Sequence, residues 1–202
     1  MKTLESLEHI LKKITCMRRG QKYEGLKNIS LHIQNMEYEK YNFIILRLKK
    51  QIEIVKKYNP PVRPAMDPMV SSYLGLYSGL DFPEEYGLLM GYPKCCIESF
   101  KSARFAIDNN HLKEVEEIKE NILNRTNLNN NLGENNNYAI VLTSGFIPCS
   151  LKCRESWNKG LIALISFKEY KNIVKLEREL LNELPHYHGG YNEYFEKIFL
   201  KK

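Results

Sequence analysis

Two short cysteine-bearing stretches hold the residues best suited to chemistry. The first reads GYPKCC over residues 91–96, and the second reads GFIPCSLKC over residues 145–153. In each stretch a glycine, an aromatic residue and a proline precede the cysteines. Together they hold four of the five cysteines of the chain, which are Cys95, Cys96, Cys149 and Cys153. The repeated context favours the hypothesis that the two stretches meet and form one site.

The four cysteines fall where two helices are expected to begin, one after residue 93 and one from residue 150. The first turn of a helix presents unpaired backbone N–H groups and the positive end of the helix dipole, and both favour a thiolate. Lys94, Lys152 and Arg154 lie beside the cysteines in sequence. We therefore expect these thiols to ionise more readily than a free cysteine, whose pKa is about 8.5. The thiolate is the form that binds metals and attacks electrophiles.

Four thiolates would satisfy a tetrahedral zinc site or an iron–sulfur cluster. The spacing of Cys149 and Cys153 fits a zinc pair, whereas the adjacent pair Cys95 and Cys96 is unusual for zinc and occurs in iron–sulfur and thiol-exchange sites. The sequence thus predicts a metal centre, Zn or Fe–S, with these four cysteines as its ligands. His186 and His188 lie two residues apart and could supplement a ligand, although a surface turn with incidental histidines is favoured.

Two alternatives to a metal centre remain open. In the first, the two cysteine pairs never meet, and each cysteine only fills space at the start of a helix. In the second, they meet without a metal and form a dithiol/disulfide switch or a thiol transfer enzyme. The fifth cysteine, Cys16, is interpreted as a lone buried residue that acts as a small hydrophobe. The sequence has no Walker loop, dinucleotide-type glycine fingerprint or Ser-His-Asp order, so whether the chain is an enzyme stays open.

Composition and charge bound the possible partners. The chain has 202 residues with a formal net charge of +6, from 30 basic and 24 acidic residues. The basic residues alternate with acidic ones along the expected N-terminal helices, so solvated helix faces are favoured over a nucleic-acid-binding module that uses those helices. A homo-oligomer is possible. No apolar run approaches the roughly 20 residues of a membrane span, and the N-terminus lacks an apolar signal core, so we expect a cytoplasmic protein without a membrane partner.

Hydrophobic periodicity predicts helices over most of the chain. Apolar residues recur at helical spacing over 4–20, 26–33 and 37–58, and further helices are expected over 69–78, from 81, from 94, and over 111–123, 150–170, 173–184 and 191–200. The asparagine-rich stretch 124–137 is expected to be a loop, and residues 138–143 to be a strand or the first turns of a helix. The expected fold class is all-α or predominantly α, a multi-helix orthogonal bundle with at most one short strand pair.

A proline-rich segment marks the clearest boundary in the chain. Residues 59–68 contain four prolines, which cannot continue the preceding helix. We expect an N-terminal helical region over 1–58, a linker over 59–68 and a cysteine-bearing helical domain over 69–202. The segment could equally be a packed, extended stretch that crosses the core, in which case the two parts pack as one domain.

The two cysteine motifs resemble those of a known family. The stretch GYPKCCIESF at 91–100, followed about fifty residues later by IPCSLKC at 147–153, is similar to the core pattern of domain of unknown function 483, an uncharacterised archaeal family found in methanogens. The resemblance covers residues 67–170. It implies a cytoplasmic archaeal protein in which the two motifs act together, and it implies no activity.

Overall fold

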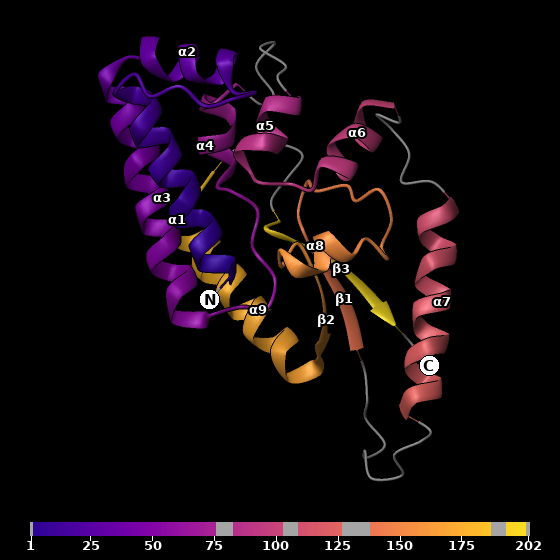
Figure 1. Ribbon diagram of the computed structural model, residues 1–202. Coiled ribbons are helices and arrows are strands. Elements are labelled where there is room, and N and C mark those ends of the chain that lie inside the picture. The colour runs from indigo at the N-terminus through magenta and orange to yellow at the C-terminus, as the bar shows by residue number, and fades with distance from the viewer. Residues whose placement is uncertain (1, 76–82, 103–108, 127–137, 187–192, 201–202) are drawn as a thin grey trace.

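A computed structural model describes residues 2–75, 83–102, 109–126, 138–186 and 193–200. The described chain is predominantly helical, as predicted, and contains one small antiparallel sheet (Figure 1). The helices are α1 (Lys2–Arg18), α2 (Lys27–Asn35), α3 (Tyr38–Tyr58), α4 (Pro68–Tyr73), α5 (Pro83–Leu89), α6 (Lys94–Ser102), α7 (Asn109–Thr126), α8 (Arg154–Asn158) and α9 (Phe167–Glu183). The strands are β1 (Tyr138–Thr143), β2 (Ile162–Ser166) and β3 (Phe195–Leu200). None of the described helices is both long and apolar enough to cross a membrane.

The long N-terminal helices α1 and α3 form where hydrophobic periodicity predicts them. They pack against each other, with α2 at one end of α1, and α9 packs on α3 (Figure 1). Their apolar residues at helical spacing are buried, and these are Leu7, Ile10, Ile14 and Met17 on α1 and Ile44, Leu48, Ile54 and Val55 on α3. The predicted helices over 4–20 and 37–58 are therefore confirmed, because each presents one apolar face to a shared core.

The proline-rich segment after α3 runs through the interior. Asn59 ends the helix in the left-handed region, with φ of 43°. Val62, Arg63, Met66 and Asp67 that follow are almost completely buried. The largest core cluster contains residues from both sides of this segment, from α1 and α3 before it to α9 and β3 after it. The division at 59–68 stays a prediction, and the two parts that it separates share one hydrophobic core.

The sheet is the layer that supports the cysteine-bearing segments. Its strand order is β2-β1-β3, and both pairings are antiparallel. The central strand β1 is buried on both faces: Ala139 and Val141 belong to the core shared with α1, α3 and α9, whereas Ile140 and Leu142 belong to a second cluster that includes Cys96. A strand buried on both faces shows no alternation of apolar and polar residues, which is why periodicity alone left 138–143 undecided between strand and helix.

Two predicted helices are wrong, and the sheet therefore has three strands where at most a pair was expected. In place of the predicted helix over 150–170, the chain forms a loop, the short helix α8 and strand β2, and only residues 167–170 are helical beyond them, as the start of α9. The predicted helix over 191–200 contains strand β3. Gly160, with φ of +65°, ends α8. Leu164 and Ile165 follow the apolar residue 161 by three and four positions, which is the spacing of one helix face, and this is why a helix was predicted. Pairing with β1 decides the structure of both segments, and this long-range interaction leaves no local pattern.

Several expected features lie partly outside the described residues. The predicted helix over 69–78 is described only as α4, and the start expected at Asp81 falls outside, with α5 beginning at Pro83. Most of the expected asparagine-rich loop also falls outside, since the structure describes this part of the chain only to the end of α7 and again from β1.

Candidate metal centre

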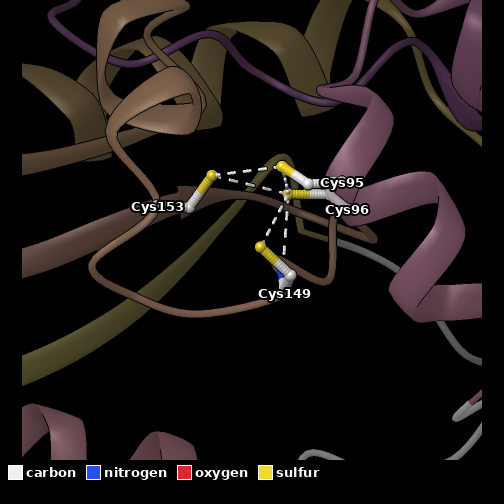
Figure 2. A group of neighbouring side chains, drawn as sticks. All are labelled: Cys95, Cys96, Cys149 and Cys153. Atoms are coloured by element: carbon white, nitrogen blue, oxygen red, sulfur yellow. Dashed lines mark hydrogen bonds between the residues drawn. The ribbon is translucent and has the colours of Figure 1, made fainter.

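The four predicted cysteines lie together, although the two pairs are more than fifty residues apart in sequence (Figure 2). Their sulfur atoms all lie within 4.8 Å of one another. The Sγ of Cys96 is 4.0 Å from that of Cys95, 3.7 Å from that of Cys149 and 3.8 Å from that of Cys153. The Sγ atoms of Cys95 and Cys153 are 3.7 Å apart. All four cysteines are free thiols, and the group could hold a metal ion.

The first pair lies at the start of a helix, as predicted. Cys95 and Cys96 are the second and third residues of α6, and the Cys96 and Ile97 amides donate hydrogen bonds to the carbonyl of Pro93. Adjacent residues of a helix point in different directions, and here Cys95 is exposed while Cys96 is buried. Cys96 therefore joins the hydrophobic cluster under the site, and Cys95 lies on its exposed side, as Cys149 does.

The second pair corrects the prediction of a helix from residue 150 that begins at Cys149, because only Cys153 lies at the start of a helix. Cys153 precedes α8 as its N-cap, and Cys149 lies in the loop before it. The Cys153 amide donates to the carbonyl of Ser150, so the loop turns back on itself. The Cys149 amide points at the other pair and lies 3.4 Å from the Sγ of Cys96. A turn, rather than a helix, therefore brings Cys149 and Cys153 close to Cys95 and Cys96.

The shared glycine and aromatic positions of the two motifs explain how the loops are joined. Gly91 and Gly145 both have positive φ, 68° and 70°, a conformation that glycine adopts at no steric cost. The aromatic residues that follow them, Tyr92 and Phe146, pack against each other with ring centroids 4.7 Å apart. The motif therefore repeats for a structural reason, because each glycine turns the chain and each aromatic ring holds one loop against the other.

The electrostatic environment differs among the thiols, and it differs from the expectation that all of them ionise readily. Burial raises the pKa of Cys96 to about 11, against hydrogen bonds from Ser156 and Cys149. Burial, followed by the neighbouring Cys96 sulfur, also raises the pKa of Cys149. Burial acts in the same direction on Cys153, but hydrogen bonds from the side chain and backbone of Ser156 lower its pKa to about 7. Without a bound cation, Cys153 is thus the thiol of these three that ionises most readily.

Outer contacts fix the loop that carries the second pair. The carboxylate of Glu114 on α7 accepts hydrogen bonds from the Ser150 hydroxyl and the Leu151 amide, both at 2.7 Å. The Trp157 indole donates to the Leu151 carbonyl at 2.7 Å, and Lys152 pairs with Glu117. Sequence reasoning missed Glu114, because it lies among several similar carboxylates on an amphipathic helix and nothing local distinguishes it.

The histidines and the fifth cysteine lie elsewhere. The ring of His186 packs edge-on against Tyr194, and its Nδ1 lies 3.3 Å from the Leu184 carbonyl. His186 is therefore not part of the described thiol group, and His188 lies outside the described residues. Cys16 is half-buried on α1 and is also apart from the group.

Comparisons with known proteins place the chain in a family. A family model described as "Protein of unknown function (DUF483)" matches residues 48–181. An uncharacterized protein of Methanocaldococcus jannaschii is 49% identical over 195 residues, covering 96% of this chain and 99% of that protein. An uncharacterized protein of Methanothermobacter thermautotrophicus is 43% identical over 196 residues, covering 96% and 98%. The comparison with solved structures gives no match. The chain belongs to the family of domain of unknown function 483, as its two cysteine motifs predicted.

Proposed function

We propose that the protein binds a single zinc ion through Cys95, Cys96, Cys149 and Cys153. The spacing of the sulfur atoms carries this proposal. With Zn–S bonds of about 2.3 Å, the sulfurs of a tetrahedral site lie about 3.8 Å apart. The four separations between neighbouring sulfurs are 3.7, 3.7, 3.8 and 4.0 Å. The other two of the six separations are at most 4.8 Å, so the spacing of the group supports one tetrahedral ion.

An iron–sulfur cluster fits the same group less well. The cysteine sulfurs of a four-iron cluster are held on separate iron atoms and lie roughly 6 Å apart. Here all four sulfurs are within 4.8 Å of one another. Binding a cluster would require the α6 pair to move away from the loop pair, against the contact between Tyr92 and Phe146. The spacing therefore supports one ion over a cluster.

The proposed role of the ion is structural. Zinc with four protein ligands has no open position for water or substrate, whereas catalytic zinc keeps one. The ligands come from two segments that the ion would link, the start of α6 and the loop before α8. Among the described residues the sheet pairings involve neither segment, so thiolate bonds would supply a cross-link that sheet hydrogen bonds do not.

Cobalt substitution tests the coordination. Co²⁺ added to the metal-free protein is expected to give intense visible absorption typical of tetrahedral sites, together with thiolate charge-transfer bands, and to saturate at one ion per chain. Zinc should then displace the cobalt and remove the colour. A weak spectrum of the octahedral type, or saturation at a different ratio, would count against a four-thiolate site.

Glu114 is expected to hold the loop in the geometry that the ion requires. Replacing it by glutamine removes the carboxylate that binds Ser150 and Leu151, so the affinity for zinc should fall roughly tenfold. Competition with a chromophoric chelator measures this change. Glu116→Gln on the same helix is the matched control, because Glu116 is 68% exposed and pairs only with Lys119 in the described structure. Equal zinc affinities for the two variants would show that Glu114 does not hold the loop for metal binding.

A second candidate function, thiol exchange without metal, is favoured by the lowered pKa of Cys153. In the metal-free protein Cys153 is expected to alkylate with a midpoint near pH 7, since thiolate predominates above its pKa of about 7, whereas Cys96, with a pKa of about 11, should react only at alkaline pH. Mass spectrometry after timed alkylation from pH 5 to pH 10 measures both rates. Protection of all four thiols by one equivalent of zinc would favour the metal site, and slow reaction of Cys153 at neutral pH would exclude thiol exchange.

A further inference from the structure

A cleft lies where four parts of the chain meet. It has a volume of about 510 Å³, within the range of about 300–1,000 Å³ that is typical of small-molecule sites. Its lining comes from the start of α1, from the end of α3 and the prolines after it, from the end of α8 with Gly160, and from the first turns of α9. None of the four clustered cysteines lines it. The cleft is therefore a second candidate site, with room for a small molecule.

The lining of the cleft carries little charge. Among the described residues, no lysine, arginine or histidine lines it, and Glu169 is its one acidic residue. Oε2 of Glu169 accepts hydrogen bonds from the amide and the hydroxyl of Ser166, both at 2.8 Å, and Oε1 has no partner in the described structure. A phosphate or carboxylate would find no counter-charge in this lining and would be repelled by Glu169. The cleft therefore suits an uncharged ligand with hydroxyl groups that can donate to the carboxylate.

Two aromatic side chains contribute carbon surface to the cleft. The hydroxyl of Tyr58 donates to the Glu179 carboxylate at 2.8 Å, and the indole N–H of Trp157 donates to the Leu151 carbonyl at 2.7 Å. The polar end of each side chain is therefore engaged elsewhere and holds the ring in place. Rings of this kind stack on nucleobases, because every base has a flat π face.

Two asparagines supply hydrogen-bonding groups to the cleft. Asn158 is the last residue of α8 and Asn172 lies on α9, and both are exposed. Neither side-chain amide has a hydrogen-bond partner among the described residues. An amide carries a donor and an acceptor side by side. This pair matches the adjacent donor and acceptor on the edge of a nucleobase, as when asparagine binds adenine.

We propose that this cleft binds a nucleoside, which is an uncharged planar base with its sugar. The base stacks against Trp157 and binds the amides of Asn158 and Asn172, and the sugar hydroxyls donate to Glu169. Glu169 and Asn172 lie three residues apart on α9, so they share one face of that helix. The proposal does not rest on a bound metal.

Fluorescence titration of the full-length wild-type protein tests this inference without a label. Trp157 is the one tryptophan of the chain, so its emission reports on this cleft. Adenosine, guanosine, cytidine and uridine are titrated separately, with excitation at the long-wavelength edge of tryptophan absorption, and calorimetry gives the binding ratio. At least one nucleoside should change the emission and bind at one site per chain. Absence of binding by all four would overturn the proposal.

Two comparisons test the chemical class of the ligand. The nucleoside that binds is compared with its monophosphate and with free ribose. The monophosphate should bind no more tightly than the nucleoside, because no described basic residue lines the cleft. Ribose should bind more weakly by roughly tenfold or more, because it lacks the base that the ring and the amides would hold. Tighter binding of the monophosphate, or equal binding of ribose, would overturn the assignment to a nucleoside.

A pair of matched variants assigns the binding to the cleft. Asn172→Ala removes one amide from an exposed helix position, so affinity for the nucleoside should fall roughly tenfold. Asn42→Ala makes the same change at an exposed position of α3 that does not line the cleft, and it should bind as the wild type does. Equal affinities for the two variants would overturn the assignment. A crystal structure of the wild type with the nucleoside needs no variant: density beside Trp157 is expected, and density elsewhere would overturn the proposal.

Discussion

Replacing Cys96 by serine is expected to abolish metal binding and to lower the free energy of unfolding by about 3 kcal/mol or more. The Cys96 sulfur lies within 4.0 Å of those of Cys95, Cys149 and Cys153, and it is the buried member of the group. A serine hydroxyl is a poor ligand for zinc, and the remaining three ligands would have to bind beside a buried polar group. Metal analysis after dialysis and urea unfolding measure the two effects.

The fifth cysteine provides the matched control. Cys16→Ser removes a thiol on α1 that is apart from the group, so metal content should stay at one ion per chain. The double variant Cys149→Ser with Cys153→Ser should reproduce the loss seen for Cys96→Ser. Unchanged metal content and thermal stability in that double variant would refute the proposed centre.

Replacing Asp67 by alanine is expected to lower the free energy of unfolding by about 3–5 kcal/mol, through the core and independently of the metal. Asp67 is fully buried, and its two carboxylate oxygens accept hydrogen bonds from Nε and Nη2 of Arg47. It also caps α4 by accepting from the amides of Met69 and Val70. The variant leaves the Arg47 charge, whose side chain is only 12% exposed, without its carboxylate partner and with only the Pro185 carbonyl among the acceptors described, and it leaves α4 without its cap. Urea unfolding followed by circular dichroism measures the loss.

A surface ion pair is the control for this effect. Lys50 and Glu183 are 3.2 Å apart, with side chains 37% and 48% exposed. Solvent screens such a pair, so Glu183→Ala should change stability by less than about 1 kcal/mol. Similar losses for Asp67→Ala and Glu183→Ala would show that the buried network does not hold the core together.

The helical part of the fold was predictable because its signal is local. The helices α1 and α3 each bury one stripe of apolar residues, and this stripe repeats every three to four residues in the sequence. The strands β2 and β3 were not predictable in this way. The backbone of β3 is held by pairing with β1 and by Glu177, which accepts hydrogen bonds from the amides of Tyr194 and Phe195. These partners lie far along the chain, so the sequence around β3 contains no record of them.

The membership of the thiol group was predictable, whereas its geometry was not. The repeated glycine, aromatic and proline context brought Cys96 and Cys149 into one hypothesis, and the packing of Tyr92 on Phe146 is its physical basis. The loop conformation around Cys149 depends on Glu114, a residue from another element. The unequal pKa values depend on the burial of Cys96 and on the hydrogen bonds from Ser156 to Cys153, and neither can be read from the periodicity of the sequence.

Elemental and sulfide analysis of the wild-type protein, purified without oxygen and without affinity-tag metal, tests the central claim most directly. The spacing of the four sulfurs predicts one zinc ion per chain and no acid-labile sulfide. Iron accompanied by sulfide would contradict the single-ion centre and favour a cluster. Protein free of metal, with all four thiols open to titration, would contradict a metal centre of either kind.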